Sequence, residues 1–247
     1  LVVANILLAV RIFDFITDPL VGYLSDRTRS RWGRRKPWMA LAIPVMMLGF
    51  YKVFMPGDNV DAYYMLGWMM WLSLGTTMMM IPYYAWAAEL SPDYNERSRI
   101  TGWRSMMGVV GSLIAQLVPT VALLLFAYGG SAAVLNIVGV TILMLMPICV
   151  VLTLTRVQDA QPLSEPRLPF KQGLQLMLQN SPFKRLLLTF MVGSIALNIT
   201  TPLYLFFITF VLGAEEKAIY MLCFFYLANF VGVPFWVKLS TKIGKHK

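Results

Sequence analysis

Seven long runs of apolar residues, separated by short polar stretches, dominate the pattern of this chain. They cover residues 1–24, 37–55, 63–88, 101–128, 132–155, 186–212 and 218–239. A helix rises about 1.5 Å per residue, so about 20 residues cross the roughly 30 Å hydrocarbon core of a bilayer. The pattern therefore predicts an all-α, polytopic membrane protein with about seven transmembrane helices.

The stretch between the fifth and sixth runs has a different character. Gln161–Pro166 has the composition of a linker, and Phe170–Leu178 predicts a short amphipathic helix lying on the membrane face. We therefore predict an N-terminal helical bundle at residues 1–155, a central cytoplasmic loop at 156–185 and the start of a C-terminal bundle at 186–247. The basic segment at residues 242–247 resembles the first basic loop, which suggests an internal repeat of about six helices.

The charged residues of the chain fix the predicted orientation of these helices. Only 13% of the residues are charged and 58% are hydrophobic, yet the net charge is +9. The cations gather in alternate loops, such as residues 25–36 and 89–99, whereas residues 56–61 and 213–217 form short loops that contain acidic residues. Under the positive-inside rule the basic loops are cytoplasmic, and nucleic acid is not an expected partner.

Two carboxylates lie inside the first apolar run. Asp14 and Asp18 are four residues apart, which places them on one face of a helix, and Arg11 lies on nearly the same stripe. Ionised groups are costly in a membrane and usually mark ion or substrate pathways. One arginine balances only one carboxylate, so the pattern favours a site for a cation over a structural ion pair with Arg11, which is the alternative.

Two long motifs carry a resemblance to a known family. They are Arg11–Pro19 continued by Gly22 and Asp26–Arg34, and Ile81–Tyr83 continued by Glu89–Arg99. In order and spacing they resemble the glycoside-pentoside-hexuronide:cation symporters of the major facilitator superfamily. The resemblance implies helices two to eight of a twelve-helix fold and symport of a sugar or glycoside with Na⁺ or H⁺ by alternating access. It also implies no enzymatic activity, no cofactor, and a location in a bacterial inner membrane.

The resemblance implies roles for individual residues. The cation-binding residues are Asp14, Thr17, Asp18 and Thr77; the substrate-binding residues are Tyr84 and Arg104; the gating residues are Gly22, Asp26, Arg27, Gly33 and Arg34. Met80 departs from the pattern, because the melibiose permease of that family has a sugar-binding aspartate there. The simpler alternatives are that Arg104 reaches the cytoplasmic headgroups and that the basic loop only fixes the topology.

Two other functions fit parts of the pattern. A relative of the same fold that moves a lipid or another amphiphile would share the motifs. An intramembrane prenyltransferase would use Asp14 and Asp18 to hold Mg²⁺ on a diphosphate, but that chemistry needs a second acidic cluster. No other apolar run of the sequence contains one.

The predicted topology can be tested by chemical labelling. In a background without Cys149 and Cys223, a cysteine replacing Asp58 should react with an impermeant maleimide added outside intact cells. A cysteine replacing Glu165 should react only after the membrane is permeabilised. The reverse pattern would overturn the predicted orientation of every loop.

Overall fold

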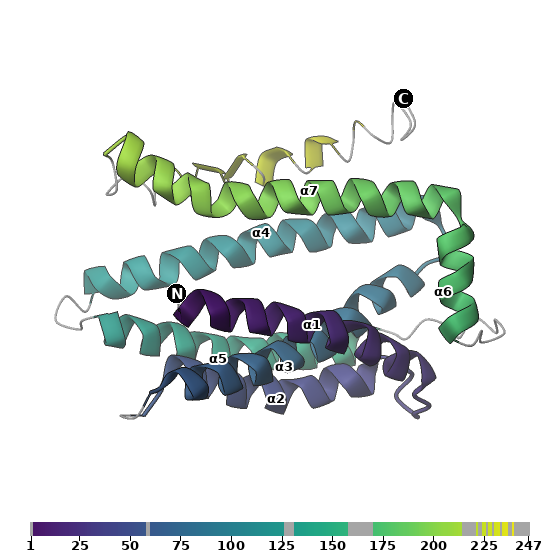
Figure 1. The fold of residues 1–247 in the computed structure, drawn as a ribbon, viewed down its shortest axis with the longest axis horizontal. Coiled ribbons are helices and arrows are strands. Elements are labelled where there is room, and N and C mark those ends of the chain that lie inside the picture. The colour runs from purple at the N-terminus through teal and green to yellow at the C-terminus, as the bar shows by residue number, and fades with distance from the viewer. Residues whose placement is uncertain are drawn as a thin grey trace. The chain divides into compact units, whose positions relative to one another are not determined.

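The chain folds into helices. Its computed structural model describes residues 2–57, 60–125, 131–157 and 170–213, together with scattered residues between 221 and 239, and contains no strand among them. In chain order the helices are α1 (Val2–Arg27), α2 (Lys36–Phe54), α3 (Ala62–Glu89), α4 (Tyr94–Leu125), α5 (Ser131–Arg156), α6 (Phe170–Gln179) and α7 (Ser181–Phe206), which continues into the π-helical turn η1 (Phe207–Val211) (Figure 1).

Six of the seven predicted apolar runs coincide with described helices. The first five runs correspond to α1–α5, the predicted amphipathic helix is α6, and the sixth run is α7 with η1. Helix α7 continues through Asn198–Pro202 to Phe206. The seventh run lies mostly outside the described residues.

Three of the described helical segments are long and apolar enough to cross a membrane by length and composition. They are Lys36–Phe54, Leu135–Arg156 and Ser181–Thr200. In α1, three ionisable residues interrupt the apolar run, so its crossing of the membrane rests on those residues finding partners inside the protein.

The chain divides into two compact units. One contains Leu1–Gln161 with Phe230–Lys247, and the other is Pro162–Asn229. In the second unit, α6 and α7 are joined at Asn180, whose side-chain oxygen accepts from the Phe183 amide at 3.2 Å and so caps α7. The predicted two-bundle organisation stays a prediction.

Polar residues define where the helices of the first unit begin. The Asp61 carboxylate accepts from the Tyr64 amide at 2.7 Å and caps α3. The Asp93 carboxylate accepts from the amides of Glu96 and Asn95 at the start of α4. These backbone hydrogen bonds hold the pKa of Asp93 below its usual range, because they favour the ionised carboxylate.

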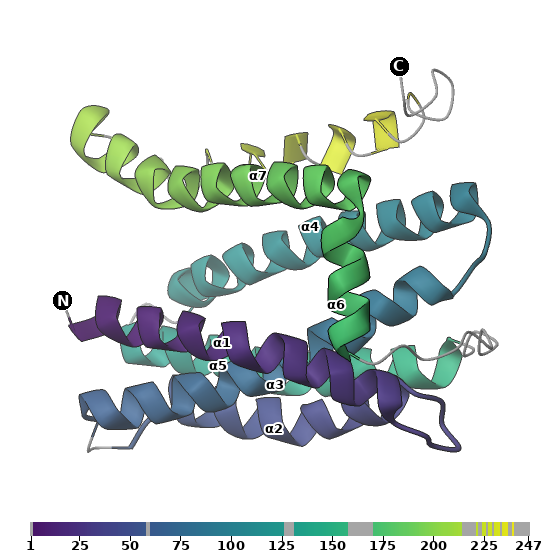
Figure 2. The ribbon, with the colours of Figure 1, turned by 45° about the vertical axis from the view of Figure 1, so that its right-hand side comes forward.

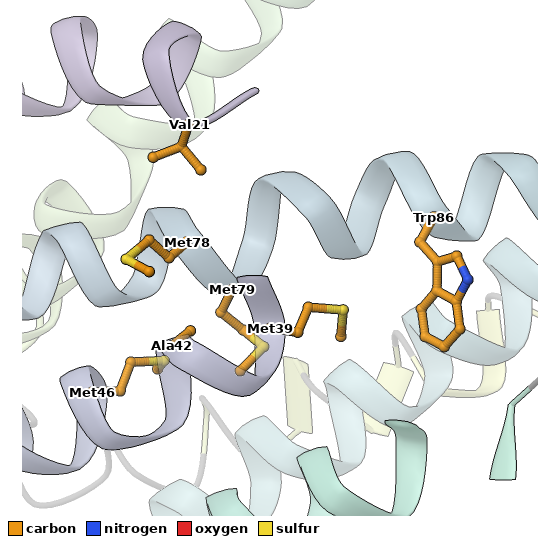
Figure 3. Close-up of a cluster of buried hydrophobic side chains, with 7 residues drawn as sticks. All are labelled: Val21, Met39, Ala42, Met46, Met78, Met79 and Trp86. Carbon is orange, nitrogen blue, oxygen red and sulfur yellow. The ribbon is translucent and has the colours of Figure 1, made fainter. Parts of the chain in front are cut away.

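Helix α3 packs against both α1 and α2, and α5 packs against α2, as Figures 1 and 2 show. The buried core of this unit consists of Val21 from α1, Met39, Ala42 and Met46 from α2, and Met78, Met79 and Trp86 from α3 (Figure 3). Methionine fills irregular space between helices without branching at Cβ. Most other large apolar side chains are exposed and would be covered by lipid or by further helices.

Close approach of α2 and α3 depends on glycine. A Cβ atom on Gly75 would lie 2.8 Å from the Met46 Cγ and 3.2 Å from the Met46 backbone nitrogen. By contrast, a Cβ atom on Gly22 of α1 would meet only Ile81 of α3, at an ordinary contact distance of 3.6 Å. Of these two glycines, Gly75 therefore lies at the tighter helix contact.

Substituting Gly75→Ala should separate α2 from α3. We expect a loss of about 1–3 kcal/mol of stability from overpacking, measured as a lower apparent Tm of the purified full-length protein in detergent. Gly67→Ala is the matched control on the same helix, because its Cβ atom would have no neighbour within 4 Å. Equal melting temperatures for the two variants would contradict close packing at Gly75.

Candidate functional site

Asp14 and Asp18 of α1 each receive a hydrogen bond from α3. The Thr77 hydroxyl donates to Asp18 Oδ1 at 2.8 Å, and the Ser73 hydroxyl donates to Asp14 Oδ1. Asp14 and Asp18 are four residues apart on α1, and Ser73 and Thr77 are four residues apart on α3. The carboxylates and the hydroxyls therefore lie in register across the α1–α3 contact. The site thus contains four oxygen-bearing side chains from two helices.

The charges of the two carboxylates are balanced unequally. Arg11 Nη1 lies 3.4 Å from Asp14 Oδ2, but the Arg11 side chain is 81% exposed whereas that of Asp14 is 17% exposed. Among the described residues Asp18 has no ion-pair partner. One negative charge is therefore left without a cation, which is the condition that attracts a small cation to a poorly solvated site.

The chemistry of the donor set indicates which ion it suits. Carboxylate and hydroxyl oxygens are hard ligands that suit Na⁺ and not soft transition metals. Across the described part of the chain, no three His, Cys, Asp or Glu side chains gather in a way that could hold a metal ion. By their chemistry, two carboxylates and two hydroxyls can coordinate one monovalent cation or share a proton.

The structure brings three of the four predicted cation-binding residues together. Asp14, Asp18 and Thr77 meet at the α1–α3 contact. Thr17 is buried, but its hydroxyl donates to the Phe13 carbonyl of its own helix at 3.1 Å, and no contact with either carboxylate is seen in the described chain. Ser73 was missed by sequence reasoning. Its spacing from Thr77 equals that between the two aspartates, which is the signal that could have identified it.

The predicted substrate residues lie together at a cleft. The Arg104 guanidinium carbon lies 4.6 Å from the centroid of the Tyr84 ring, a cation–π geometry. Both residues line a cavity of about 690 Å³ formed by α3, α4 and α5. Met80, Tyr83, Trp103 and Met107 also line it, so its wall is mostly apolar and aromatic with one cation.

A charged network joins α1, α2 and α3 at the end where the basic loop lies. Buried Arg35 contacts Asp26 at 2.5 Å and Glu89 at 2.9 Å, and its guanidinium also donates to the Ser25 hydroxyl at 3.1 Å. Arg34 lies 3.3 Å from the other Glu89 oxygen. Two arginines and two acids therefore hold three helix ends together.

The predicted gating residues divide into two groups. Asp26 and Arg34 belong to the charged network. Arg27 lies outside it, with its guanidinium 4.2 Å from the Tyr23 ring centroid, and Gly33 has a φ of 87° that permits the tight turn before α2. Sequence reasoning missed Arg35, because neighbouring arginines in a basic run look alike until burial distinguishes them.

Comparison with known proteins identifies the family of the chain. A family model described as MFS/sugar transport protein matches residues 1–247. The chain belongs to this family. Members of the MFS/sugar transport protein family are membrane transporters, which fits the several apolar helices of the structure.

Three relatives align over nearly the whole chain. The inner membrane symporter YicJ of Escherichia coli is 26% identical over 93% of this chain and 51% of its own length. The putative glycoside/cation symporter YagG of the same organism is 28% identical over 94% and 51%, and a sodium-dependent lysophosphatidylcholine symporter 1 of Xenopus tropicalis is 25% identical over 97% and 53%. The chain thus spans about half the length of these relatives, all of which are named symporters.

Removing Arg35 should destabilise this region far more than removing Arg27. Arg35→Gln leaves Asp26 and Glu89 without their shared partner, so we expect a loss of about 1–3 kcal/mol, measured as a lower apparent Tm in detergent. Arg27→Gln removes the same charge from the end of α1, and Arg27 has no ion pair among the described residues. Similar melting temperatures would show that the network adds nothing to helix packing.

Proposed function

We propose that the chain forms part of a secondary transporter that moves a sugar or glycoside together with Na⁺ or H⁺. The downhill movement of the cation would drive uptake. The observation that carries this proposal is the pairing of Asp14 with Ser73 and of Asp18 with Thr77 across α1 and α3. A bound cation would replace the hydroxyl protons as the partner of the carboxylates, and the hydroxyl lone pairs would join its coordination shell.

The cleft beside Tyr84 and Arg104 is the proposed substrate site. It lies on the same helix as the cation site, since Thr77 and Tyr84 are seven residues apart, or about 10 Å along the helix axis. An aromatic face suits the apolar side of a sugar ring, and the guanidinium can donate to its oxygens. A shift of α3 caused by cation binding would reach the cleft directly, which supplies a physical route for coupling.

The network of Asp26, Arg35 and Glu89 is the proposed gate on the side that the charge pattern predicts to be cytoplasmic. Its ion pairs tie the ends of α1, α2 and α3 together. Opening of a pathway between these ends must break them, so their strength would set the balance between the outward-open and inward-open forms.

Transport assays on the full-length protein in proteoliposomes test the cation site. Asp14→Asn combined with Asp18→Asn should abolish accumulation of glycoside against its gradient, because the site then has no charge to attract a cation. Glycoside should still move down its own concentration gradient, since the cleft is unchanged. Accumulation with unaltered dependence on Na⁺ and pH would falsify the proposal. The assays use several glycosides and a lysophospholipid, because one group of relatives carries such a molecule in its name.

The contribution of the α3 hydroxyls can be measured separately. Ser73→Ala and Thr77→Ala should each raise the Na⁺ or H⁺ concentration for half-maximal uptake by about tenfold, which is the loss of one hydrogen-bonding partner of a charged group. Thr76→Ala is the matched control, because the Thr76 hydroxyl donates to the Ser73 carbonyl of its own helix at 2.8 Å. Ser73→Thr should restore the wild-type value. If Thr76→Ala weakened the cation response as much, helix packing and not ligation would explain the effect.

A further inference from the structure

The basic loop contains more positive charge than the gate uses. Residues 27–36 carry six cations, namely Arg27, Arg29, Arg31, Arg34, Arg35 and Lys36. Arg34 and Arg35 pair with acids, and Arg27 lies over Tyr23. Among the described residues Arg29 and Arg31 have no ion-pair or hydrogen-bond partner, and both are exposed. The structure thus separates cations that hold helices together from cations that face outward.

One of the outward-facing cations lines a cavity. Arg31, Trp32, Gly33 and Lys36 form one wall of a space of about 390 Å³, and Leu154 and Thr155 at the end of α5 form the other. This cavity is separate from the proposed substrate cleft, since the two share no lining residue. It lies where α5 ends and α2 begins.

Hydrogen bonds fix both walls of this cavity. Lys36 Nζ donates to the carbonyls of Leu154 at 3.1 Å and Val157 at 2.8 Å, which joins the start of α2 to the end of α5. In the loop, the Trp32 amide donates to the Ser30 hydroxyl at 3.2 Å and the Gly33 amide to the Ser30 carbonyl at 3.1 Å. The turn so formed leaves the Trp32 side chain 68% exposed beside Arg31.

We propose that this cavity binds the phosphate headgroup of an anionic membrane lipid. The cavity lies at the ends of α2 and α5, both of which are long and apolar enough to cross a membrane, so it lies at headgroup depth. An exposed arginine and an exposed tryptophan are the side chains expected to meet phosphate and the membrane interface. Clusters of cations next to the cytoplasmic end of a membrane helix attract anionic lipids in the same way.

The surface of α5 next to the cavity suits an acyl chain. Val151 and Ile148 lie four and seven residues before Thr155 on one face of the helix, and Met144 continues the stripe by a further turn. All three are at least half exposed. A lipid phosphate held by Arg31 would therefore place its acyl chains along an apolar helix face, a contact that a free phosphate ion lacks.

Lipid titration of the full-length protein tests this site. Detergent-solubilised protein is titrated with dioleoylphosphatidylglycerol, and bound lipids are counted by native mass spectrometry, with dioleoylphosphatidylcholine as the uncharged reference. Arg31→Gln should weaken binding of the anionic lipid about fivefold, the effect of one cation near a lipid surface. Arg99→Gln is the matched control, because Arg99 is also exposed on the predicted cytoplasmic side but does not line the cavity.

Each outcome of this titration decides the proposal. A selective loss in Arg31→Gln, with no competition from excess inorganic phosphate, supports a lipid site. Equal losses in Arg31→Gln and Arg99→Gln would mean that net charge alone attracts lipid, which overturns the site. Displacement of the lipid by inorganic phosphate would assign the cavity to a free anion. Binding that does not depend on lipid charge would also overturn the proposal. Arg31 is exposed, so its replacement should leave the apparent Tm unchanged, and this serves as the folding control.

Discussion

Ionised side chains within a membrane helix need partners inside the protein, and this constraint explains the position of α3. The carboxylates of Asp14 and Asp18 cannot face lipid without a large free-energy cost. Helix α3 presents Ser73 and Thr77 to them at the matching spacing, so both carboxylates accept a hydrogen bond across the helix contact. The hydrogen bonds satisfy the oxygens but do not neutralise the charge. In the proposed function, the remaining negative charge would attract the coupling cation.

Helix α3 also connects the other features of the first unit. Its methionines enter the core against α2, its Tyr84 lines the cleft with Arg104, and its Glu89 joins the charged network. Because a helix moves as a nearly rigid body, a small displacement of α3 at Thr77 would also displace Tyr84 and Glu89. In the proposed function, α3 would be one mechanical element shared by cation binding, substrate binding and gating, which is the simplest physical basis for coupling between them.

The basic loop shows why residues of the same type and charge need not have the same role. Arg35 is buried and shared between Asp26 and Glu89, so its charge is used within the protein. Arg31 lies four residues earlier, is exposed, and lines a cavity at the end of α5. Both residues contribute equally to the positive-inside pattern. Only burial and the identity of their neighbours distinguish Arg35, which joins helices, from Arg31, which is exposed.

The sequence by itself determined the helical class, the described helices α1–α7 and the location of Asp14 and Asp18 on one face, because run length and spacing within a single helix depend only on local geometry. It also indicated the family through its motifs. The tertiary structure decided the partners: Ser73 opposite Asp14, Arg35 and not Arg27 beside Asp26, and Gly75 against Met46 at a close contact of α2 and α3. These pairings depend on how each helix is rotated and shifted against its neighbour. That rotation is set by packing of side chains from several helices at once, so no pattern within one helix reveals it.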